Sequence, residues 1–264
     1  MPRVVALYRY PVKSFTPEAC DVLTVLDEGR IVEDRVLGFR FANSNVMNDA
    51  WSKKHEFVAL VNTPGLARLH LRFDHKTLRL CISVEGTVLV NEALDEIGRK
   101  KIAAAIENYV LKLIDDNPLS SHPERLPLRL VGNGITPRYQ DNEAGQITLH
   151  SRASLAAIGS AVGDNDLSEL RFRSNIAIDG LDAWEEQSWV GRKIRIGQIN
   201  FDVVMSKSRC LATQANPNSG KRDLPILKTL THAFSQEKPT FAIAMLTCGA
   251  GGEIHVGDKV SLLN

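Results

Sequence analysis

The sequence predicts a mainly β protein of the α+β class, built as two domains. Thirteen short segments are either continuously apolar or alternate between apolar and polar residues, and many are bounded by Gly, Pro, Asn or Asp, as β-strands are. Only three segments space their apolar residues as an α-helix does. Because short strands outnumber helices so strongly, we expect barrels or curled sheets with a few helices.

The strands are expected, in chain order, at residues 4–8, 20–26, 57–61, 66–73, 78–82, 87–90, 128–131, 146–150, 176–178, 193–196, 199–204, 241–247 and 259–262. The helices are expected at residues 94–113, 152–162 and 224–232. Asn91 and Ser151 are the candidates to cap the first and the second helix, because their side-chain oxygens can accept a hydrogen bond from a free amide of the first turn.

A linker is expected at residues 115–127. This stretch contains an Asn-Pro pair, a His-Pro pair and two serines, which break both the helical and the strand periodicity. We therefore expect one domain at residues 1–116 and a second at residues 117–264.

The charge balance and the hydropathy exclude some partners. The net charge is +1, from 32 basic and 31 acidic residues, so no global field favours a nucleic-acid backbone or an anionic bilayer. The N-terminus lacks a long apolar core, and no run of about 18 apolar residues occurs. We expect neither a signal peptide nor a membrane anchor, and neither nucleic acid nor membrane as a partner.

The four cysteines, Cys20, Cys81, Cys210 and Cys248, are far apart in the sequence. They form no C-x-x-C pair and have no paired histidines, so neither a zinc site nor an iron–sulfur cluster is predicted. A chain with 44% hydrophobic residues can bury a core without disulfide bonds. We therefore expect a reducing, cytoplasmic environment.

Cys210 is the candidate centre of the chemistry. It ends the tripeptide Ser208-Arg209-Cys210, and a turn-forming stretch follows at residues 216–220. The neighbouring Arg209 guanidinium favours the thiolate, which is the form that binds a soft metal or carries sulfur. The alternative is a small buried hydrophobic side chain, which is the commoner role of a single cysteine.

Lys13 and Ser14 offer a second functional feature. They follow the first predicted strand on a turn that Pro11 stiffens, and an ammonium beside a hydroxyl can hold a phosphate. The alternative is that both side chains are ordinary solvent-exposed surface.

Arg171 and Arg173 offer a third functional feature. In an extended strand these two guanidiniums share one face, where they repel each other unless an anion lies between them. The alternative is an edge strand whose arginines pair with Glu169 or Asp179.

Taken in this order, the segments resemble the MOSC family, which is named for the C-terminal part of molybdenum cofactor sulfurases. The matching pieces are Y-P-V-K-S at 10–14, D-R at 34–35, R-F-R-x-N at 171–175, the aromatic-acid pair at 183–185, S-R-C at 208–210 with Asn-Pro at 216–217 and Gly at 220, and V-G-D at 256–258. The chain departs from the usual pattern at Phe15, Ser174 and Asn216. The resemblance implies an N-terminal β-barrel-like domain followed by a MOSC β-barrel domain with a few helices.

The resemblance also implies a cofactor and its site. In the reductase branch, which includes the mitochondrial amidoxime-reducing component and YcbX-like proteins, the residue that matches Cys210 is the protein ligand to molybdenum and the catalytic residue. The residues implied to bind the molybdenum cofactor (Mo-molybdopterin) are Lys13, Ser14, Arg35, Arg171, Arg173, Asn175, Ser208 and Arg209. The cofactor is expected between the two domains.

The activity that the resemblance implies is an oxidoreductase that removes oxygen from small N-hydroxylated compounds. Its electrons are expected from a separate flavin or iron–sulfur protein. Pyridoxal phosphate is associated with the wider family, but no pyridoxal-phosphate desulfurase precedes the predicted barrel, so we do not expect the chain to take sulfur from cysteine by itself. One alternative is a carrier that holds the cofactor, or a persulfide sulfur, for transfer elsewhere. Another is a barrel scaffold without chemistry.

Overall fold

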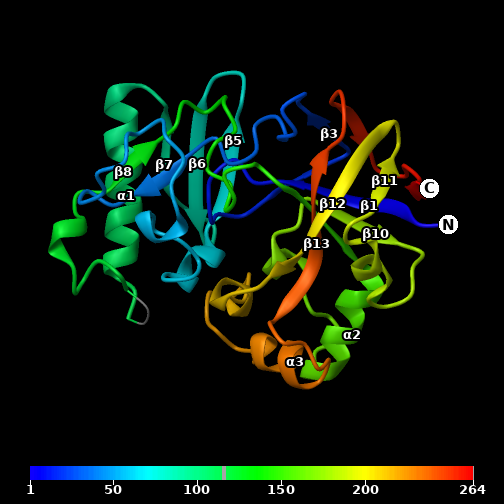
Figure 1. The fold of residues 1–264 in the computed structure, drawn as a ribbon. Helices are drawn as coiled ribbons and strands as arrows, with labels where there is room; N and C mark the ends of the chain where they lie inside the picture. Colours follow the sequence, from blue (N-terminus) through cyan, green and yellow to red (C-terminus); the bar gives the residue numbers. More distant parts are fainter. Residues whose placement is uncertain (115–116, 264) are drawn as a thin grey trace.

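The computed structural model describes residues 1–114 and 117–263, which form two lobes lying side by side (Figure 1). The strands are β1 Arg3–Arg9, β2 Glu18–Cys20, β3 Val22–Val25, β4 Gly38–Arg40, β5 His70–Asp74, β6 Arg79–Val84, β7 Thr87–Ala93, β8 Arg129–Val131, β9 Ile147–Ser151, β10 Ile176–Asp179, β11 Lys193–Ile196, β12 Ile199–Ser208, β13 Thr240–Thr247, β14 Gly252–His255 and β15 Val260–Leu263. The helices are α1 Glu96–Leu111, α2 Arg152–Val162 and α3 Ile226–His232. The predicted mainly β, α+β class is confirmed, and none of the helices in the described residues is long and apolar enough to cross a membrane.

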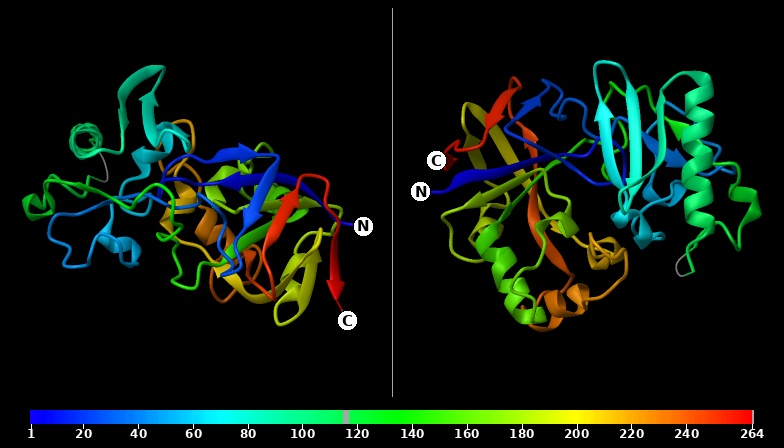
Figure 2. Two further views of the ribbon diagram at one scale, coloured as in Figure 1. Left: turned by 90° about the horizontal axis from the view of Figure 1, so that it is seen from above. Right: turned by 180° about the vertical axis from the view of Figure 1, so that it is seen from behind.

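The larger lobe is built on an eight-stranded sheet in the spatial order β15-β11-β12-β13-β9-β10-β1-β2. Only the pair of β9 and β10 is parallel. Arg3 at the start of β1 also forms a bridge with Lys259, directly before β15. The Val4 amide donates to the Asp258 carbonyl (2.9 Å). The sheet therefore curls far enough to bring β1 next to the residues that directly precede β15. The two chain ends consequently lie at the same end of the molecule in both views of Figure 2.

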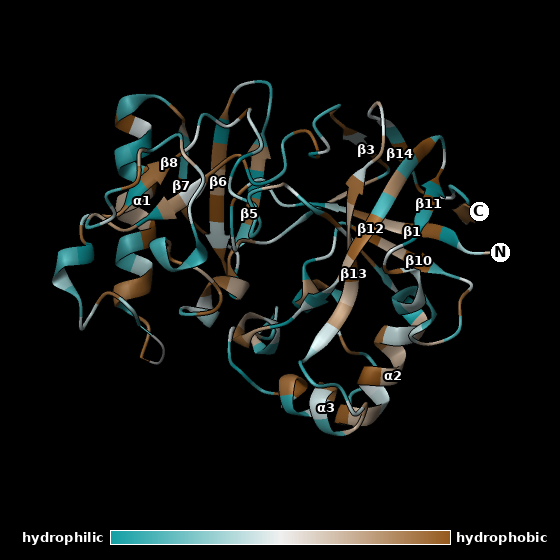
Figure 3. Ribbon diagram, in the orientation of Figure 1, coloured by the Kyte–Doolittle hydropathy of each residue, from teal (hydrophilic) through white to brown (hydrophobic). Residues whose placement is uncertain are grey.

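The curled sheet encloses one hydrophobic core, to which β3 and β14, paired with each other, also contribute. Alternate residues of the strands point inward, as the period of two requires. Fully buried members include Leu7, Leu23, Leu149, Ile176, Phe201, Ile243 and Ile254. Figure 3 shows this as hydrophobic colour concentrated on the strands of the lobe.

The helix α2 begins and ends where the sequence predicts. The Ser151 hydroxyl accepts a hydrogen bond from the Ala153 amide (3.2 Å), which confirms the predicted cap, and Gly163 at φ +75° ends the helix in the left-handed conformation that glycine tolerates. α2 lies against β9 and β10 and packs on α3 (Figure 1).

The smaller lobe consists of the antiparallel sheet β5-β6-β7, the helix α1 that lies against β7 and β8, and the strand pair β4-β8. The Asp95 carboxylate caps α1 by accepting from the Gly98 amide (2.8 Å). The prediction that Asn91 caps this helix is wrong, because β7 continues through Asn91 to Ala93 and pairs Asn91 with Cys81.

Two predicted strands differ from the structure. Phe57 in the segment 57–61 makes only an isolated bridge with Arg40, and the segment 66–73 begins as the 3-10 helix Pro64–Arg68 before β5. Proline fixes φ and removes an amide donor, so it favours the start of a helical turn over a strand here.

The domain limits of 1–116 and 117–264 stay a prediction, but the two lobes do not follow that division of the chain. β1, β2 and β3 belong to the larger lobe, whereas β8, at Arg129–Val131, pairs with β4 in the smaller lobe. The chain therefore passes between the lobes more than once, and residues distant in sequence meet where they touch.

Candidate functional site

A cavity of about 210 Å³ lies between the lobes. Lys54 and Ala59–Val61 line it from the smaller lobe, and β9 and the end of β12 line it from the larger lobe. Eight of the predicted site residues line this cavity: Lys13, Ser14, Arg35, Arg171, Arg173, Ser208, Arg209 and Cys210. These eight residues come from four separate parts of the chain and are brought to one space, although what they bind stays a prediction.

Asn175, the ninth predicted site residue, lies behind the cavity wall. It is fully buried, and its amide group donates to the Tyr8 carbonyl (3.2 Å). The same amide group lies 3.5 Å from the Asp34 carboxylate. These contacts connect β1, β10 and the loop that carries Arg35, so the structure gives Asn175 a supporting position.

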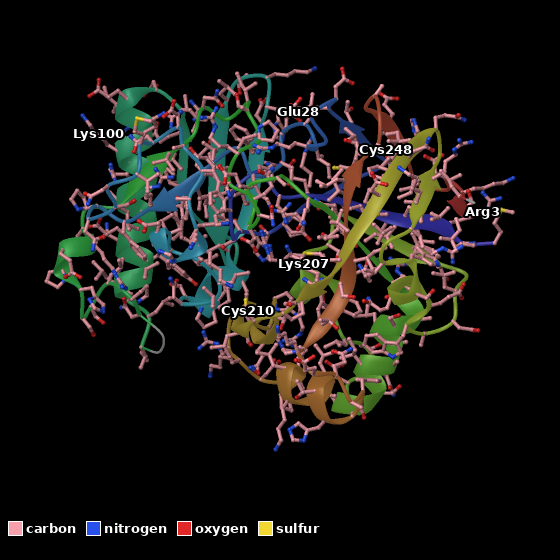
Figure 4. All side chains as sticks on the ribbon, in the orientation of Figure 1. Arg3, Glu28, Lys100, Lys207, Cys210 and Cys248 are labelled. Atoms are coloured by element: carbon pink, nitrogen blue, oxygen red, sulfur yellow. The ribbon has the colours of Figure 1, made fainter. Side chains whose placement is uncertain are left out.

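Cys210 follows the end of β12 and directly precedes the 3-10 helix Leu211–Gln214. Its carbonyl accepts from both the amide and the hydroxyl of Thr213 (3.0 Å each), which fixes the turn. Cys210 is half-buried and lines the cavity wall. Figure 4 shows Cys210 and Lys207 near each other between the lobes, far from Cys248.

Arg209 supports this turn from inside the larger lobe. Its guanidinium donates to the carbonyls of Phe241 (2.7 Å) and Phe172 (2.9 Å) and lies over both rings. Burial lowers the pKa of Arg209 to about 10, which still leaves the group charged at neutral pH. Arg209 therefore acts as a brace beside Cys210, and its hydrogen-bonding capacity is largely used within the protein.

Arg35 and Arg173 lie against the same aromatic ring. The centre of each guanidinium is close to the centroid of Tyr10, at 4.7 Å for Arg35 and 4.3 Å for Arg173. Asp34 pairs with Arg35 (2.5 Å), whereas the Arg173 guanidinium donates to the Phe15 carbonyl (2.5 Å). Of these two adjacent guanidiniums, only Arg35 forms an ion pair with a carboxylate among the described residues, an arrangement that favours an anion beside Arg173.

The expectation that Arg171 and Arg173 share one face of a strand is wrong. Glu169–Phe172 is a 3-10 helix, and Arg173 follows it in the left-handed conformation (φ 55°). The two side chains diverge, because Arg171 forms an ion pair with Asp223 (2.9 Å). Its buried Nε atom has no hydrogen-bond partner within the described residues.

Lys13 is buried, so the alternative that it is ordinary surface is wrong. Only 3% of the residue is exposed, and its ammonium donates to the Tyr139 carbonyl (2.9 Å) and the Asp141 carboxylate (2.6 Å). Burial lowers the pKa of Lys13, and Lys13 in turn holds the pKa of the Asp141 carboxyl well below its usual range. Ser14 follows at φ 70°, which turns the chain along the cavity wall.

Three functional candidates lie in no motif and were missed. Lys207 lines the cavity half-buried, and burial lowers its pKa. Gln140 and Gln146 also line it, and each has a buried side-chain oxygen with no hydrogen-bond partner in the part of the chain that the structure describes. Lys207 lies two residues before Arg209, which was the available indication in the sequence.

The cavity is strongly cationic. Its wall carries seven cationic side chains and one carboxylate among the described residues, Asp141. Asp141 pairs with Lys13, and Asp34 and Asp223 behind the wall pair with Arg35 and Arg171. Four of the seven cations therefore form no ion pair with a carboxylate of the described residues. The space is therefore suited to a polar, anionic ligand next to a thiol.

Residues 136–261 match the family model of the MOSC domain. The match covers 126 of the 264 residues, in the second half of the chain. Over 98% of its length the chain is 25% identical to mitochondrial amidoxime-reducing component 1 of Homo sapiens, covering 82% of that protein. The protein of the same name from Danio rerio is 31% identical over 45% of this chain and 37% of its own.

Among solved structures, the YuaD protein from Bacillus subtilis is similar, with a TM-score of 0.42 and 11% identity. The superposition covers 98% of this chain and 94% of that one.

Proposed function

We propose that this protein binds the molybdenum cofactor in the cavity, with Cys210 as the protein ligand to the metal, and reduces N-hydroxylated compounds. The observation that carries the proposal is the half-buried Cys210 thiol on the wall of a cavity whose cations exceed its carboxylates. The names of the amidoxime-reducing relatives support the choice of substrate.

The residues present fit this cofactor. A thiolate is a suitable ligand for a soft, redox-active metal, and Arg173, Arg35 and Ser14 offer guanidinium and hydroxyl donors for a pterin phosphate. The unpaired buried Nε of Arg171 and the unpaired Oε1 of Gln140 are a donor and an acceptor that a polar ligand would satisfy. Lys13, held by Asp141, contributes positive charge behind this set.

The overall reaction is R–NH–OH + 2 e⁻ + 2 H⁺ → R–NH₂ + H₂O, in which the N–O bond breaks and nitrogen is reduced. When bound, the cofactor supplies a centre that exchanges two electrons; the electrons come from a separate flavin or iron–sulfur protein. The chain itself orients the reactants: Arg209 braces the Cys210 turn, and side chains of both lobes line the space.

Steady-state reduction of a hydroxylamine by cofactor-loaded protein tests the proposal, with rates expressed per mole of bound molybdenum. Cys210→Ser is expected to abolish turnover with the fold retained, because a hydroxyl is a far poorer ligand for a soft metal. Cys248→Ser, a matched change of a half-buried cysteine far from the cavity, is expected to keep it. Equal turnover in Cys210→Ser and wild type would reject the assignment, and bound cofactor without any reduction would favour a carrier.

A further inference from the structure

Lys207 is a cation in the cavity that the proposed cofactor set does not use. It lies near the end of β12, three residues before Cys210, and lines the same space as Lys13 and Arg35. Within residues 1–114 and 117–263, its ammonium has no hydrogen-bond acceptor and no carboxylate in ion-pair contact. Each of the other buried or half-buried cations of the wall donates a hydrogen bond to an acceptor within the protein.

The charges in the cavity leave room for a second anion. Four of the seven cations form no ion pair with a carboxylate in the part of the chain that the structure describes: Arg173, Arg209, Lys54 and Lys207. Arg209 is bound by two carbonyls inside the larger lobe, and Arg173 lies beside Arg35 on Tyr10, where a phosphate is expected. Lys207 and the exposed Lys54 therefore remain for a different anion.

The position of Lys207 indicates what that anion belongs to. Figure 4 shows Lys207 and Cys210 near each other at the junction of the lobes. A molecule that reacts next to Cys210 would bring a substituent within reach of a four-carbon lysine side chain, which binds an anion as a compact point charge. The unpaired Gln146 oxygen, on the same cavity wall, is an acceptor for the N–H or O–H groups of such a molecule.

We propose that Lys207 makes the site selective for N-hydroxylated substrates that carry a carboxylate, by pairing with that carboxylate beside Cys210. This inference rests on the function proposed above and adds the substrate class. Asp141 is the one carboxylate on the wall within the described residues. It is hydrogen-bonded to Lys13 and attracts Lys207 only from beyond ion-pair contact, so the Lys207 ammonium can still pair directly with a substrate carboxylate.

The test compares benzamidoxime with its 4-carboxylate, which differ only in the anion, on cofactor-loaded protein. Wild type is expected to prefer the carboxylate in kcat/KM by about tenfold or more, mainly through KM. Lys207→Met is expected to remove this preference, and Lys207→Arg to keep most of it. Lys228→Met, which changes an exposed lysine of α3, is the matched control and is expected to retain the wild-type ratio.

Calorimetric titration of the loaded proteins with benzoate gives a readout that needs no turnover. Benzoate is expected to bind wild type about tenfold or more tightly than Lys207→Met. Lys207-dependent benzoate binding without any reduction would uphold this anion site and reject the reductase function. Reduction of both amidoximes with equal preference in wild type and Lys207→Met would reject the inference and leave the reductase function standing. Loss of molybdenum from Lys207→Met would also reject it, because Lys207 would then serve the cofactor.

Discussion

Replacing Arg173 by alanine removes a guanidinium that is expected to hold the cofactor phosphate. This guanidinium lies 4.3 Å from the centroid of Tyr10, donates to the Phe15 carbonyl and meets no carboxylate within the described residues. Burial lowers its pKa to about 10, with Arg35 acting in the same direction and the Tyr10 hydroxyl opposing both. Arg173 therefore stays charged at pH 7 and can form a direct ion pair with a bound anion.

The size of the effect follows from these contacts. A hydrogen bond to a charged group contributes about 1.5–3 kcal/mol, so losing it weakens cofactor retention by about 10- to 150-fold. The lost stacking on Tyr10 would cost about 0.5–2 kcal/mol of folding stability, which is small enough to leave the protein folded. Arg173→Lys keeps the charge but loses the planar pair of donors, so an intermediate loss is expected.

The assay is molybdenum and pterin content after extended dialysis, with the free energy of unfolding measured on the same samples. Arg195→Ala, at an exposed position of β11, is the matched control and is expected to retain the cofactor as wild type does. If Arg173→Ala keeps its full complement of pterin while its stability falls, Arg173 is a structural residue and the phosphate lies elsewhere.

Three further predictions concern stability, pH and the electron donor. Arg40 is fully buried and donates to three loop carbonyls and one hydroxyl. Arg40→Met is therefore expected to lower the free energy of unfolding, measured in urea, by about 3 kcal/mol or more. A loss as small as that caused by Arg72→Met, at an exposed position, would contradict this. Burial acts to raise the pKa of Glu169, but hydrogen bonds from a tyrosine, a histidine and an arginine outweigh it and hold the pKa well below its usual range. Such a carboxylate stabilises the fold above its unfolded pKa of about 4.3, and this contribution is lost as the pH falls. Glu169→Gln should therefore make the free energy of unfolding less dependent on pH below about pH 5. The same pH dependence in the variant and in wild type would contradict this role of Glu169. The exposed Lys221 is expected to contact an acidic donor protein, so Lys221→Glu should slow reduction with a protein donor at low salt but not with reduced viologen, and equal slowing with both would contradict docking there.

The elements with strong local patterns were predictable from the sequence. The nearly continuous apolar runs of β1 and β13 and the helical spacing of α2 indicate those elements locally, and the hydroxyl of Ser151 marks where α2 begins. Cys210 could be singled out from the sequence as well, because the Ser-Arg-Cys tripeptide is continuous in the chain. These features could be predicted because each depends on residues that are neighbours in the sequence.

Other features depend on contacts across the fold and could not be read from the sequence. The alternation at Arg171 and Arg173 suggested a strand, but Asp223, distant in the chain, pairs with Arg171, and the backbone turns left-handed at Arg173. Lys13 looked like surface until Asp141 was placed beside it. Lys207 has no motif at all; its importance comes only from the cavity it enters. The cytoplasmic location and the donor protein stay predictions.

The most direct test of the account is X-ray absorption at the molybdenum edge, on protein purified from a host that makes the cofactor. The account predicts molybdenum and pterin bound together, with one sulfur ligand fewer in Cys210→Ser than in wild type, while Cys248→Ser matches wild type. Absence of bound molybdenum from the wild-type protein, or the same number of sulfur ligands with and without the Cys210 thiol, would contradict it.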